Sequence, residues 1–376
     1  MIDWQNSGSH LLLNPAYSLE QKSKFQSILK SKERWPAHIW LSTSGSTVQK
    51  WVGLSKNALL VSAQAVNHHL DSGPFDKWAL ALPFFHVGGV SIWARSFLSG
   101  AKVEDFYHFS PNGKWNAALF YQFLVQQSST LTALVPTQLF DLVQLQLTAP
   151  QSLRAVVIGG GHLPAALLKE AKKQNWPILP SYGSTECCSQ VATASLCQKS
   201  TSLNLLPHMQ VSTIHGCLAF KSAALLSVYA HLQEEKWIFE DPKKDGWWVS
   251  KDRGEVTPEK ELILQGRVDD FVKVGGESVD MAKLEAILQN LKTELKIFST
   301  LTLLAFPDER LGHLIYLILE GKKEEKVALA IKEKFNSLVL PFECIRKTLW
   351  VDVIPKSSLA KILKSCLLKK VQNLSF

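Results

Sequence analysis

The segment from residue 37 to residue 185 alternates short apolar runs with longer amphipathic stretches, and this alternation limits the possible folds most strongly. The apolar runs are HIWLST, WALALPFF, LTALVP, LRAVVIGGG and ILPSYGSTE. The stretches between them have the spacing of amphipathic helices, and SKNALLVSAQAVNHHL begins with Ser55 as an expected N-cap. Strands that alternate with helices predict a mainly parallel sheet with helices on both faces.

Polar, glycine-rich segments follow four of the predicted strands. These segments are STSGST, FHVGG, GGGH and YGSTE. In open α/β sheets, ligands bind at the carboxyl ends of the strands. The four segments are therefore predicted to meet in one ligand-binding crevice.

The rest of the chain predicts two domains. After Glu186 the sequence is β-rich to about Thr257, and GRVDDFVKVGGESVDMAKLEAIL then begins a segment with a charged turn, a strand, a glycine pair and a helix. LTLLAF and LIYLILE are typical of strands, EEKVALAIKEKFNSL of a helix, and a basic helix follows IPKSS. We expect an α/β protein with a large domain over residues 1–266 and a small α+β domain over residues 267–376.

Composition narrows the class of protein. The 376 residues are 46% hydrophobic and 20% charged, enough for two globular domains, and no run approaches the ~18 apolar residues of a membrane span. The start, MIDWQNSGSH, lacks a secretory pattern, and six cysteines without a CxxC motif fit reduced thiols in the cytoplasm. The net charge of +8 is spread along the chain and by itself suits small polyanions as well as nucleic acid.

Five motifs, in order across more than 300 residues, resemble those of the adenylate-forming superfamily of acyl-CoA synthetases, luciferases and peptide-synthetase adenylation domains. TSGST (43–47) with Lys50 resembles [ST]SG[ST]TGxPK, and YGSTE (182–186) resembles YGxTE. GWWVSKDRG carries the aspartate of the third motif at Asp252. GRVDDFVKVGGESVDMAKLE and PKSSLAK (355–361) are similar to GRxDDxxKxxGxxVxxxEIE and PxTxxGK.

Three further segments resemble the o-succinylbenzoate–CoA ligases, a family of menaquinone biosynthesis. They are LALPFFHVGGVSIWARSFLSGA, ALVPTQLFDLV and LRAVVIGGGHLP. The resemblance implies an ATP-dependent ligase that activates 2-succinylbenzoate as an acyl-adenylate and transfers it to CoA, with Mg²⁺ as cofactor. It implies small-molecule partners rather than nucleic acid, and a homodimer. The alternatives are a ligase for another aryl or fatty carboxylic acid, and a non-catalytic adenylate-binding paralogue.

The resemblance also implies which residues bind the nucleotide. The hydroxyls and backbone N–H groups of the TSGST loop, together with the cation of Lys50, would bind the β- and γ-phosphates. The carboxylate of Glu186, beside Thr185, would bind Mg²⁺. Tyr182 would stack on adenine, and Asp252 and Arg267 would bind ribose or phosphate. The expected nucleotide contacts are completed by Thr43, Ser44, Gly45, Ser46, Thr47, Lys50, Gly159, Gly160, Gly161, Gly183 and Ser184.

Other residues are expected to serve the acid and CoA. The resemblance places Lys361 at the reacting carboxylate and α-phosphate during adenylation, and a hinge near Asp269 would then exchange it for the loop of Lys273, Gly275 and Gly276 along the CoA tunnel. His86 would line the acyl pocket or the CoA entry. Arg95 and Thr137 would contact the acid, because a second, buried carboxylate needs a polar partner.

The sequence departs from the superfamily pattern in three places. Val48 and Gln49 stand where GxP is expected, so we predict that the loop binds pyrophosphate more weakly and that the KM for ATP is raised. Ala360 stands where the pattern has glycine. Only 42 residues precede the TSGST loop, so we expect the N-terminal subdomain to be shortened.

Overall fold

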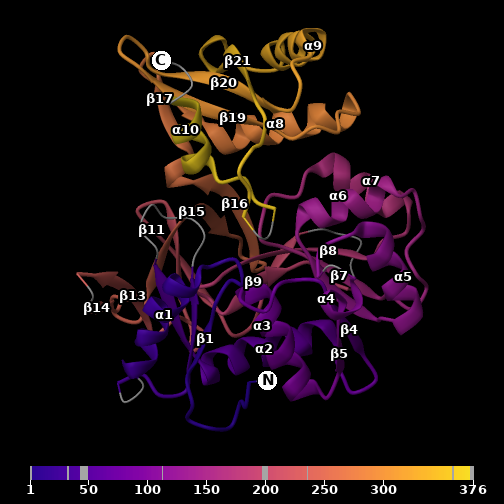
Figure 1. The fold of residues 1–376 in the computed structure, drawn as a ribbon, viewed down its shortest axis with the longest axis vertical. Helices are drawn as coiled ribbons and strands as arrows, with labels where there is room; N and C mark the ends of the chain where they lie inside the picture. Colours follow the sequence, from indigo (N-terminus) through magenta and orange to yellow (C-terminus); the bar gives the residue numbers. More distant parts are fainter. Residues whose placement is uncertain are drawn as a thin grey trace. The chain divides into compact units, whose positions relative to one another are not determined.

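A computed structural model describes residues 2–31, 34–42, 50–111, 113–196, 202–234, 236–357 and 360–372, without the side chains of Ser31 and Asp269. The chain divides into two compact units (Figure 1). The large unit comprises residues 1–163, 170–250 and 255–263, and the small unit comprises residues 164–169, 251–254 and 264–376. We expected the small domain to begin at residue 267, and the last range of the small unit begins at residue 264, three residues earlier.

The predicted parallel sheet is present in the large unit. Its parallel strands lie in the order β8-β7-β6-β4-β5, with bounds Ile178–Ser184, Ala155–Ile158, Leu131–Leu134, Lys77–Leu80 and Lys102–Asp105. β9 (Ser189–Thr193) pairs with β8 in the antiparallel direction, and β10 (Leu203–Leu205) pairs with β9 in the same way. The eleven-stranded sheet continues through β16 (Glu261–Arg267), β15 (Trp248–Val256), β12 (Cys217–Lys221) and β11 (Gln210–Ile214). The α/β class is confirmed, although the whole sheet is mixed rather than parallel.

Helices connect the parallel strands as the alternation predicted. α2 (Lys56–Leu70) packs beside α3 (Val87–Ser99), and Ser55 caps α2 by accepting a hydrogen bond from the Ala58 N–H at 3.0 Å (Figure 1). The sheet is also flanked by α5 (Ala117–Gln127), α6 (Pro136–Gln144) and α7 (Ala165–Lys173), with a short α4 (Phe106–Phe109). None of the helices in the described ranges has the length and apolar content that a membrane crossing requires.

A second sheet in the large unit was not predicted from the alternation. Its order is β1-β2-β3-β13-β14, with bounds His10–Leu12, His38–Ser42, Trp51–Ser55, Val228–Gln233 and Lys236–Glu240. β2 and β3 are antiparallel, so the chain does not pass directly from a strand to a helix here. Phe25 of α1 (Leu19–Gln26) and Ile28 of η1 (Ser27–Ser31) pack with Trp40 and Trp51 in one core cluster of this sheet.

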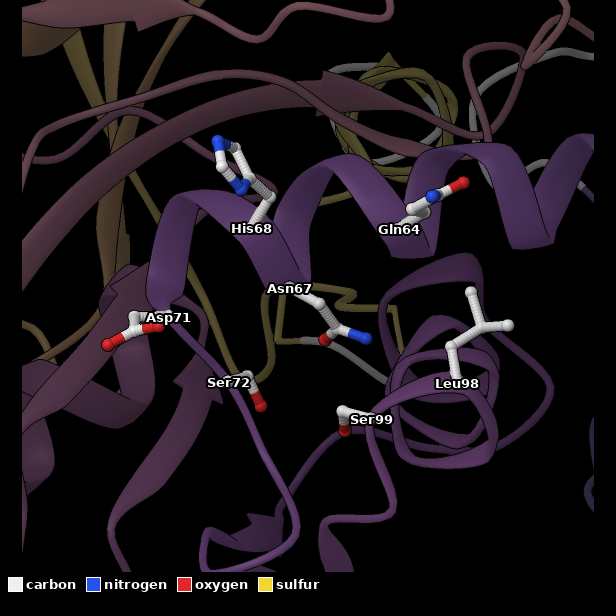
Figure 2. A pocket seen from close by; sticks show the side chains of 7 residues that line it. All are labelled: Gln64, Asn67, His68, Asp71, Ser72, Leu98 and Ser99. Atoms are coloured by element: carbon white, nitrogen blue, oxygen red, sulfur yellow. The ribbon is translucent and has the colours of Figure 1, made fainter.

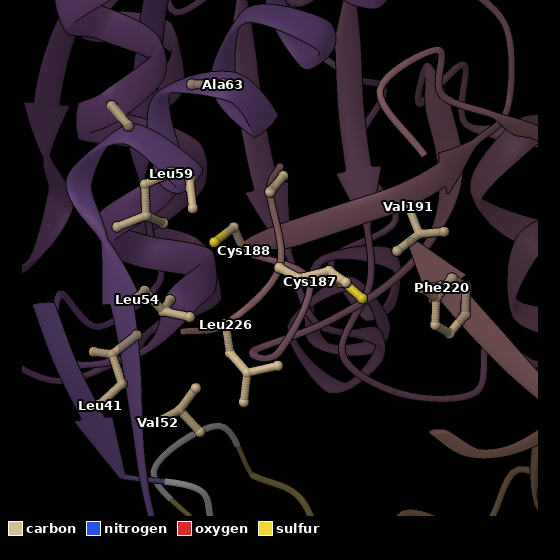
Figure 3. Packing of buried hydrophobic residues seen from close by; sticks show 14 of the residues in the cluster. Leu41, Val52, Leu54, Leu59, Ala63, Cys187, Cys188, Val191, Phe220 and Leu226 are labelled. Carbon is tan, nitrogen blue, oxygen red and sulfur yellow. The ribbon is translucent and has the colours of Figure 1, made fainter. Parts of the chain in front are cut away.

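The main core of the large unit draws on both sheets. Leu41, Val52 and Leu54 of the smaller sheet pack in one cluster with α2, α3 and the strands around β9 (Figure 3). Cys187 and Cys188 are fully buried in this cluster. The turn that carries Glu186 is therefore anchored in the core by the two residues that follow it.

The small unit is an α+β arrangement around β19 (Leu301–Asp308), β20 (Gly312–Glu320) and β21 (Ile345–Val351). Side chains alternate between the faces of this sheet. Leu303 and Leu317 pack with α8 (Met281–Glu294) and α9 (Glu325–Asn336). Leu304 and Ile318 pack with α10 (Lys364–Gln372). The hairpin of β17 (Phe271–Val274) and β18 (Glu277–Asp280) follows η2 (Val268–Asp270).

Candidate active site

The segments that follow β4, β6, β7 and β8 begin side by side. The register pairs Leu80 with Ala133 and Ile158 with Pro180, so these strands end at the same edge of the sheet. Gly159 N–H donates to the Leu134 carbonyl at 3.2 Å. The segments after β4, β7 and β8 therefore start at the same edge of the sheet, and their meeting in one ligand-binding crevice stays a prediction. Thr43, Ser44, Gly45, Ser46 and Thr47 of STSGST lie outside the described residues.

The glycine turn after β7 lies open at this edge. Gly160 and Gly161 are exposed, and Gly160 has φ +75°, a conformation that glycine adopts without strain. Thr137 is exposed in the first turn of α6, directly after β6. An exposed backbone turn beside a hydroxyl suits contacts to a bound adenine or acid, the roles predicted for Gly159–Gly161 and Thr137.

The turn after β8 is tightly constrained. A Cβ on Gly183 would lie 1.8 Å from the Ser189 carbonyl oxygen, so only glycine fits at this position. Ser184 Oγ accepts a hydrogen bond from the Cys187 N–H at 3.2 Å. Cys188 and Ser189 have φ +53° and +106°, which is uncommon for residues other than glycine. Backbone strain of this kind concentrates at functional sites, in keeping with the roles predicted for Thr185 and Glu186.

Glu186 lies beside a tyrosine that the sequence motifs did not indicate. Tyr229 Oη donates a hydrogen bond to Glu186 Oε1 at 3.0 Å, and the Trp248 indole N–H donates to Tyr229 Oη at 3.2 Å. The Lys50 ammonium lies 3.3 Å from the centroid of the Tyr229 ring. Burial, and then the negative charge of Glu186, raise the pKa of the Tyr229 phenol. The phenol therefore stays protonated as a donor to the carboxylate.

His86 and Arg95 lie on the β4–α3 segment. His86 precedes α3, and burial lowers the pKa of its imidazole to about 4, so it is neutral at physiological pH. Arg95 is only 2% exposed, and its Nη2 donates to Ser189 Oγ at 3.2 Å. Its guanidinium also lies 5.4 Å from the centre of the Trp78 ring. Arg95 thus contacts the turn that carries Glu186, and its predicted contact with a substrate carboxylate stays a prediction.

In the small unit, the two predicted ribose-binding residues contact each other. Arg267 Nη1 donates to Asp252 Oδ1 at 2.8 Å, with the aspartate side chain 15% exposed. Lys361 is exposed just before α10, where Asp252 and Asp270 attract its ammonium and Arg267 repels it. These charged groups form one cluster, in which a ribose or phosphate would have to compete with the ion pair.

The glycine pair of the small unit forms the tip of the β17–β18 hairpin. Gly275 and Gly276 have φ +61° and +89°, as a tight hairpin turn requires. The Gly275 N–H donates to the Leu311 carbonyl at 2.7 Å, which ties the hairpin to the turn between β19 and β20. Lys273 is exposed on this hairpin. The tip is therefore a supported, accessible loop, as the predicted CoA-binding role requires.

The sequence profile of the AMP-binding enzyme family matches residues 17–217, which is more than half of the 376 residues. The chain belongs to this family.

Individual family members are similar to the chain over different lengths. The 2-succinylbenzoate–CoA ligase of Escherichia coli (strain K12) is 28% identical over 345 residues, which cover 88% of this chain and 68% of the relative. The enzyme of the same name from Bacillus pumilus (strain SAFR-032) is 28% identical over 238 residues, which cover 57% of this chain and 45% of the relative. The chain thus spans about half the length of the Bacillus relatives it matches.

Solved structures support the assignment of the fold. The o-succinylbenzoate CoA synthetase from Bacillus subtilis, in complex with its acyl-adenylate intermediate, has a TM-score of 0.76 at 21% identity and covers 96% of this chain and 78% of that chain. The same synthetase in complex with ATP and a magnesium ion has a TM-score of 0.73 at 20% identity, and the match covers 95% of this chain and 78% of the synthetase. The chain shares the fold of these AMP-binding enzymes.

The residues of this family member fit a magnesium ion that arrives with its nucleotide. Among the described residues, no group of three or more His, Cys, Asp or Glu side chains could bind a metal alone. Glu186 Oε1 accepts from Tyr229, and in the described part of the chain Oε2 makes no hydrogen bond or ion pair. Mg²⁺ is usually bound by one or two carboxylates together with substrate phosphates. Glu186 therefore fits Mg–ATP better than a free ion.

A depression elsewhere in the large unit is separate from this family site. It has a volume of about 370 Å³ and is lined by residues at the ends of α2 and α3, among them Asn67, Asp71 and Ser99 (Figure 2). α3 starts beside the carboxyl end of β4 and runs back along the sheet, so its last residues lie at the opposite edge. The depression is therefore not the crevice that the motifs predicted.

Proposed function

We propose that the chain is an ATP-dependent, AMP-forming acid–CoA ligase that acts on 2-succinylbenzoate in menaquinone biosynthesis. The arrangement of Lys50, Tyr229 and Glu186 carries this proposal, because it places a cation and an oriented carboxylate at one aromatic ring. The Lys50 ammonium can neutralise the charge of the phosphates, and the Glu186 carboxylate can bind a cation that the phosphates carry. Relatives named 2-succinylbenzoate–CoA ligase support the choice of acid.

In the first half-reaction, a carboxylate oxygen of the acid attacks the α-phosphorus of ATP. A new P–O bond forms, the bond to the β-phosphate bridging oxygen breaks, and pyrophosphate leaves with that electron pair. Lys50 would neutralise phosphate charge, and Glu186 would hold the magnesium ion, which would supply charge compensation at the phosphates. Catalysis of this kind depends mainly on positioning and electrostatic stabilisation.

Lys361 is proposed to bridge the reacting carboxylate and the α-phosphate. It belongs to the small unit, and a hinge near Asp269 would bring it to the nucleotide. In the second half-reaction, the CoA thiolate attacks the acyl carbonyl and the C–O bond to AMP breaks. The hairpin of Lys273, Gly275 and Gly276 would then replace Lys361. Its ties to the β19–β20 turn support a loop that keeps its shape during this movement.

Different segments of the large unit are proposed to bind the acid. Thr137 is exposed in α6 and can donate or accept a hydrogen bond. A neutral His86 suits an apolar acyl pocket, because a charged imidazole would need a partner there. Arg95 is buried behind Ser189, so it would act on the acid through the position of Ser189.

An ATP–pyrophosphate exchange assay tests the first half-reaction. We expect exchange that depends on 2-succinylbenzoate and Mg²⁺, followed by CoA thioester formation when CoA is added. Exchange with another aryl or fatty acid alone would identify a different ligase. Adenylate binding without exchange for any acid would identify a non-catalytic paralogue.

We also propose a cytoplasmic homodimer. Free cysteines support the cytoplasmic part of this proposal: Cys187, Cys188, Cys217, Cys344 and Cys366 form no disulfide in the part of the chain described. The dimer rests on the resemblance to the family alone. Sedimentation analysis of the purified protein tests the dimer, and a monomer at micromolar concentration would contradict it.

A further inference from the structure

We propose that Tyr229 is a positioning residue that orients the Glu186 carboxylate toward the magnesium ion of Mg–ATP. The inference rests on the proposed function and adds a residue that none of the sequence motifs includes. Its basis is a chain of two hydrogen bonds, from Trp248 to Tyr229 and from Tyr229 to Glu186.

The direction of these hydrogen bonds follows from the chemistry of the three groups. An indole N–H can only donate, so Trp248 occupies an acceptor position on Tyr229 Oη. The single phenolic hydrogen is then directed at Glu186 Oε1, because an ionised carboxylate only accepts. One carboxylate oxygen is thereby held in place. Among the described residues no hydrogen bond or ion pair is made by Oε2, which is the oxygen left for a cation.

Tyr229 itself is held rigidly. It is 6% exposed and lies on β13, where it pairs with Val52 of β3. Trp248 is 8% exposed and stacks on Phe220 with ring centroids 5.9 Å apart. Glu186 lies after β8 of the other sheet, and its carbonyl accepts from the Leu226 N–H at 2.7 Å. The carboxylate is thus fixed between two sheets, as a preorganised charge should be.

The same tyrosine ring also supports Lys50. The ammonium lies 3.3 Å from the ring centroid, at the face of a ring whose hydroxyl points at Glu186. A cation over an aromatic face is attracted by the negative potential of that face. Replacement by phenylalanine keeps this face and the packing while it removes the hydroxyl. Tyr229→Phe therefore separates the orientation of Glu186 from the support of Lys50.

Calorimetric titration with ATP, with and without Mg²⁺, tests the proposal directly. Hydrogen bonds to charged groups are strong, so Tyr229→Phe should weaken binding of Mg–ATP about tenfold or more. Binding of ATP without Mg²⁺ should change less than twofold. Equal weakening in both titrations, or unchanged binding in both, would overturn the inference. A wild-type protein that does not bind ATP at all would instead refute the proposed function.

Three further variants test whether the effect is specific. Tyr121→Phe removes another tyrosine hydroxyl, which donates to the Thr148 carbonyl at 3.0 Å, and should leave both affinities unchanged. In a Glu186→Gln background, the added Tyr229→Phe change should no longer lower Mg–ATP affinity, because its effect passes through the carboxylate. If Tyr229→Phe does not fold, Trp248→Phe removes the upstream donor and should weaken Mg–ATP binding selectively by a smaller factor. An additive loss in the double variant contradicts the proposed route.

Discussion

The Arg95 guanidinium donates to Ser189 Oγ at 3.2 Å from inside the large unit. Ser189 has φ +106° and closes the turn that carries Glu186, so a buried cation holds a strained residue of the candidate site. Ser91, one turn before Arg95, also donates to Ser189 Oγ, at 3.3 Å. In the described residues, Arg95 Nε has no hydrogen-bond partner. The contact therefore links α3 to the Glu186 turn at the cost of an incompletely paired buried charge.

We expect Arg95→Met to reduce adenylation of 2-succinylbenzoate and of a mono-acid such as 4-phenylbutyrate by similar factors, about tenfold each. The reason is that the Ser189 turn loses its donor whichever acid is bound. Steady-state kcat/KM for both acids measures this. A loss confined to the di-acid would instead establish Arg95 as the partner of the second carboxylate. Thermal unfolding provides the control, because methionine fills most of the same volume and should keep the unit folded.

We expect Ala360→Gly to stabilise the protein. Ala360 has φ +56°, a conformation that disfavours a Cβ, and the superfamily pattern has glycine at this position. The expected gain is up to about 1 kcal/mol in the free energy of unfolding, measured by urea denaturation. Ala330→Gly, in the exposed face of α9, should cost about the same amount, because glycine weakens a helix. Destabilisation by both variants would refute the strain at Ala360.

We expect Lys361→Ala to slow adenylate formation by two to three orders of magnitude while it spares thioester formation from a supplied acyl-adenylate. One charged group aimed at the transition state is typically worth about 10²–10³ in rate. Lys361 is exposed, so its loss should leave the unfolding temperature nearly unchanged. The two half-reactions are measured separately by pyrophosphate exchange and by CoA ester formation. Equal losses in both would show that the lysine does not act in adenylation alone.

Because of His208, we expect the free energy of unfolding to decrease in acid. Burial lowers the pKa of its imidazole to about 4, and a backbone hydrogen bond at Gln190 offsets only part of this effect. A group whose folded pKa is depressed stabilises the fold fully above the unfolded pKa of about 6.5 and less as the pH falls toward 4. The difference corresponds to roughly 3 kcal/mol.

His208→Leu should therefore reduce the loss of unfolding free energy between pH 7 and pH 4, without lowering stability at pH 7. An apolar side chain has no proton to gain over this pH range. Urea denaturation at several pH values measures the change. Parallel pH profiles for the variant and the wild type would contradict the assigned pKa.

The local pattern of the sequence was sufficient to predict the βα alternation and the polar segments that follow its strands. The spacing of apolar residues indicates which face of an element is buried. Ser55 indicates the start of a helix because it accepts a hydrogen bond from Ala58, only three residues away. The common edge at which the segments after β4, β7 and β8 start also followed, because parallel strands end at one edge. The motif residues from Tyr182 to Glu186 were identified by their resemblance to the superfamily motif YGxTE, which is local because the residues of that turn are neighbours in the chain.

Only the tertiary structure decided what surrounds those residues. Tyr229 is 43 residues from Glu186 and lies on a different sheet, so no local spacing could connect them. Arg95 was expected to contact the acid, whereas the fold buries it and directs its Nη2 to Ser189 Oγ. The antiparallel β2–β3 pair and the strain at Ala360 depend in the same way on contacts between distant segments. Sequence periodicity determines which residues turn inward, whereas the partners they meet there are determined by the order of the strands and by packing between the sheets.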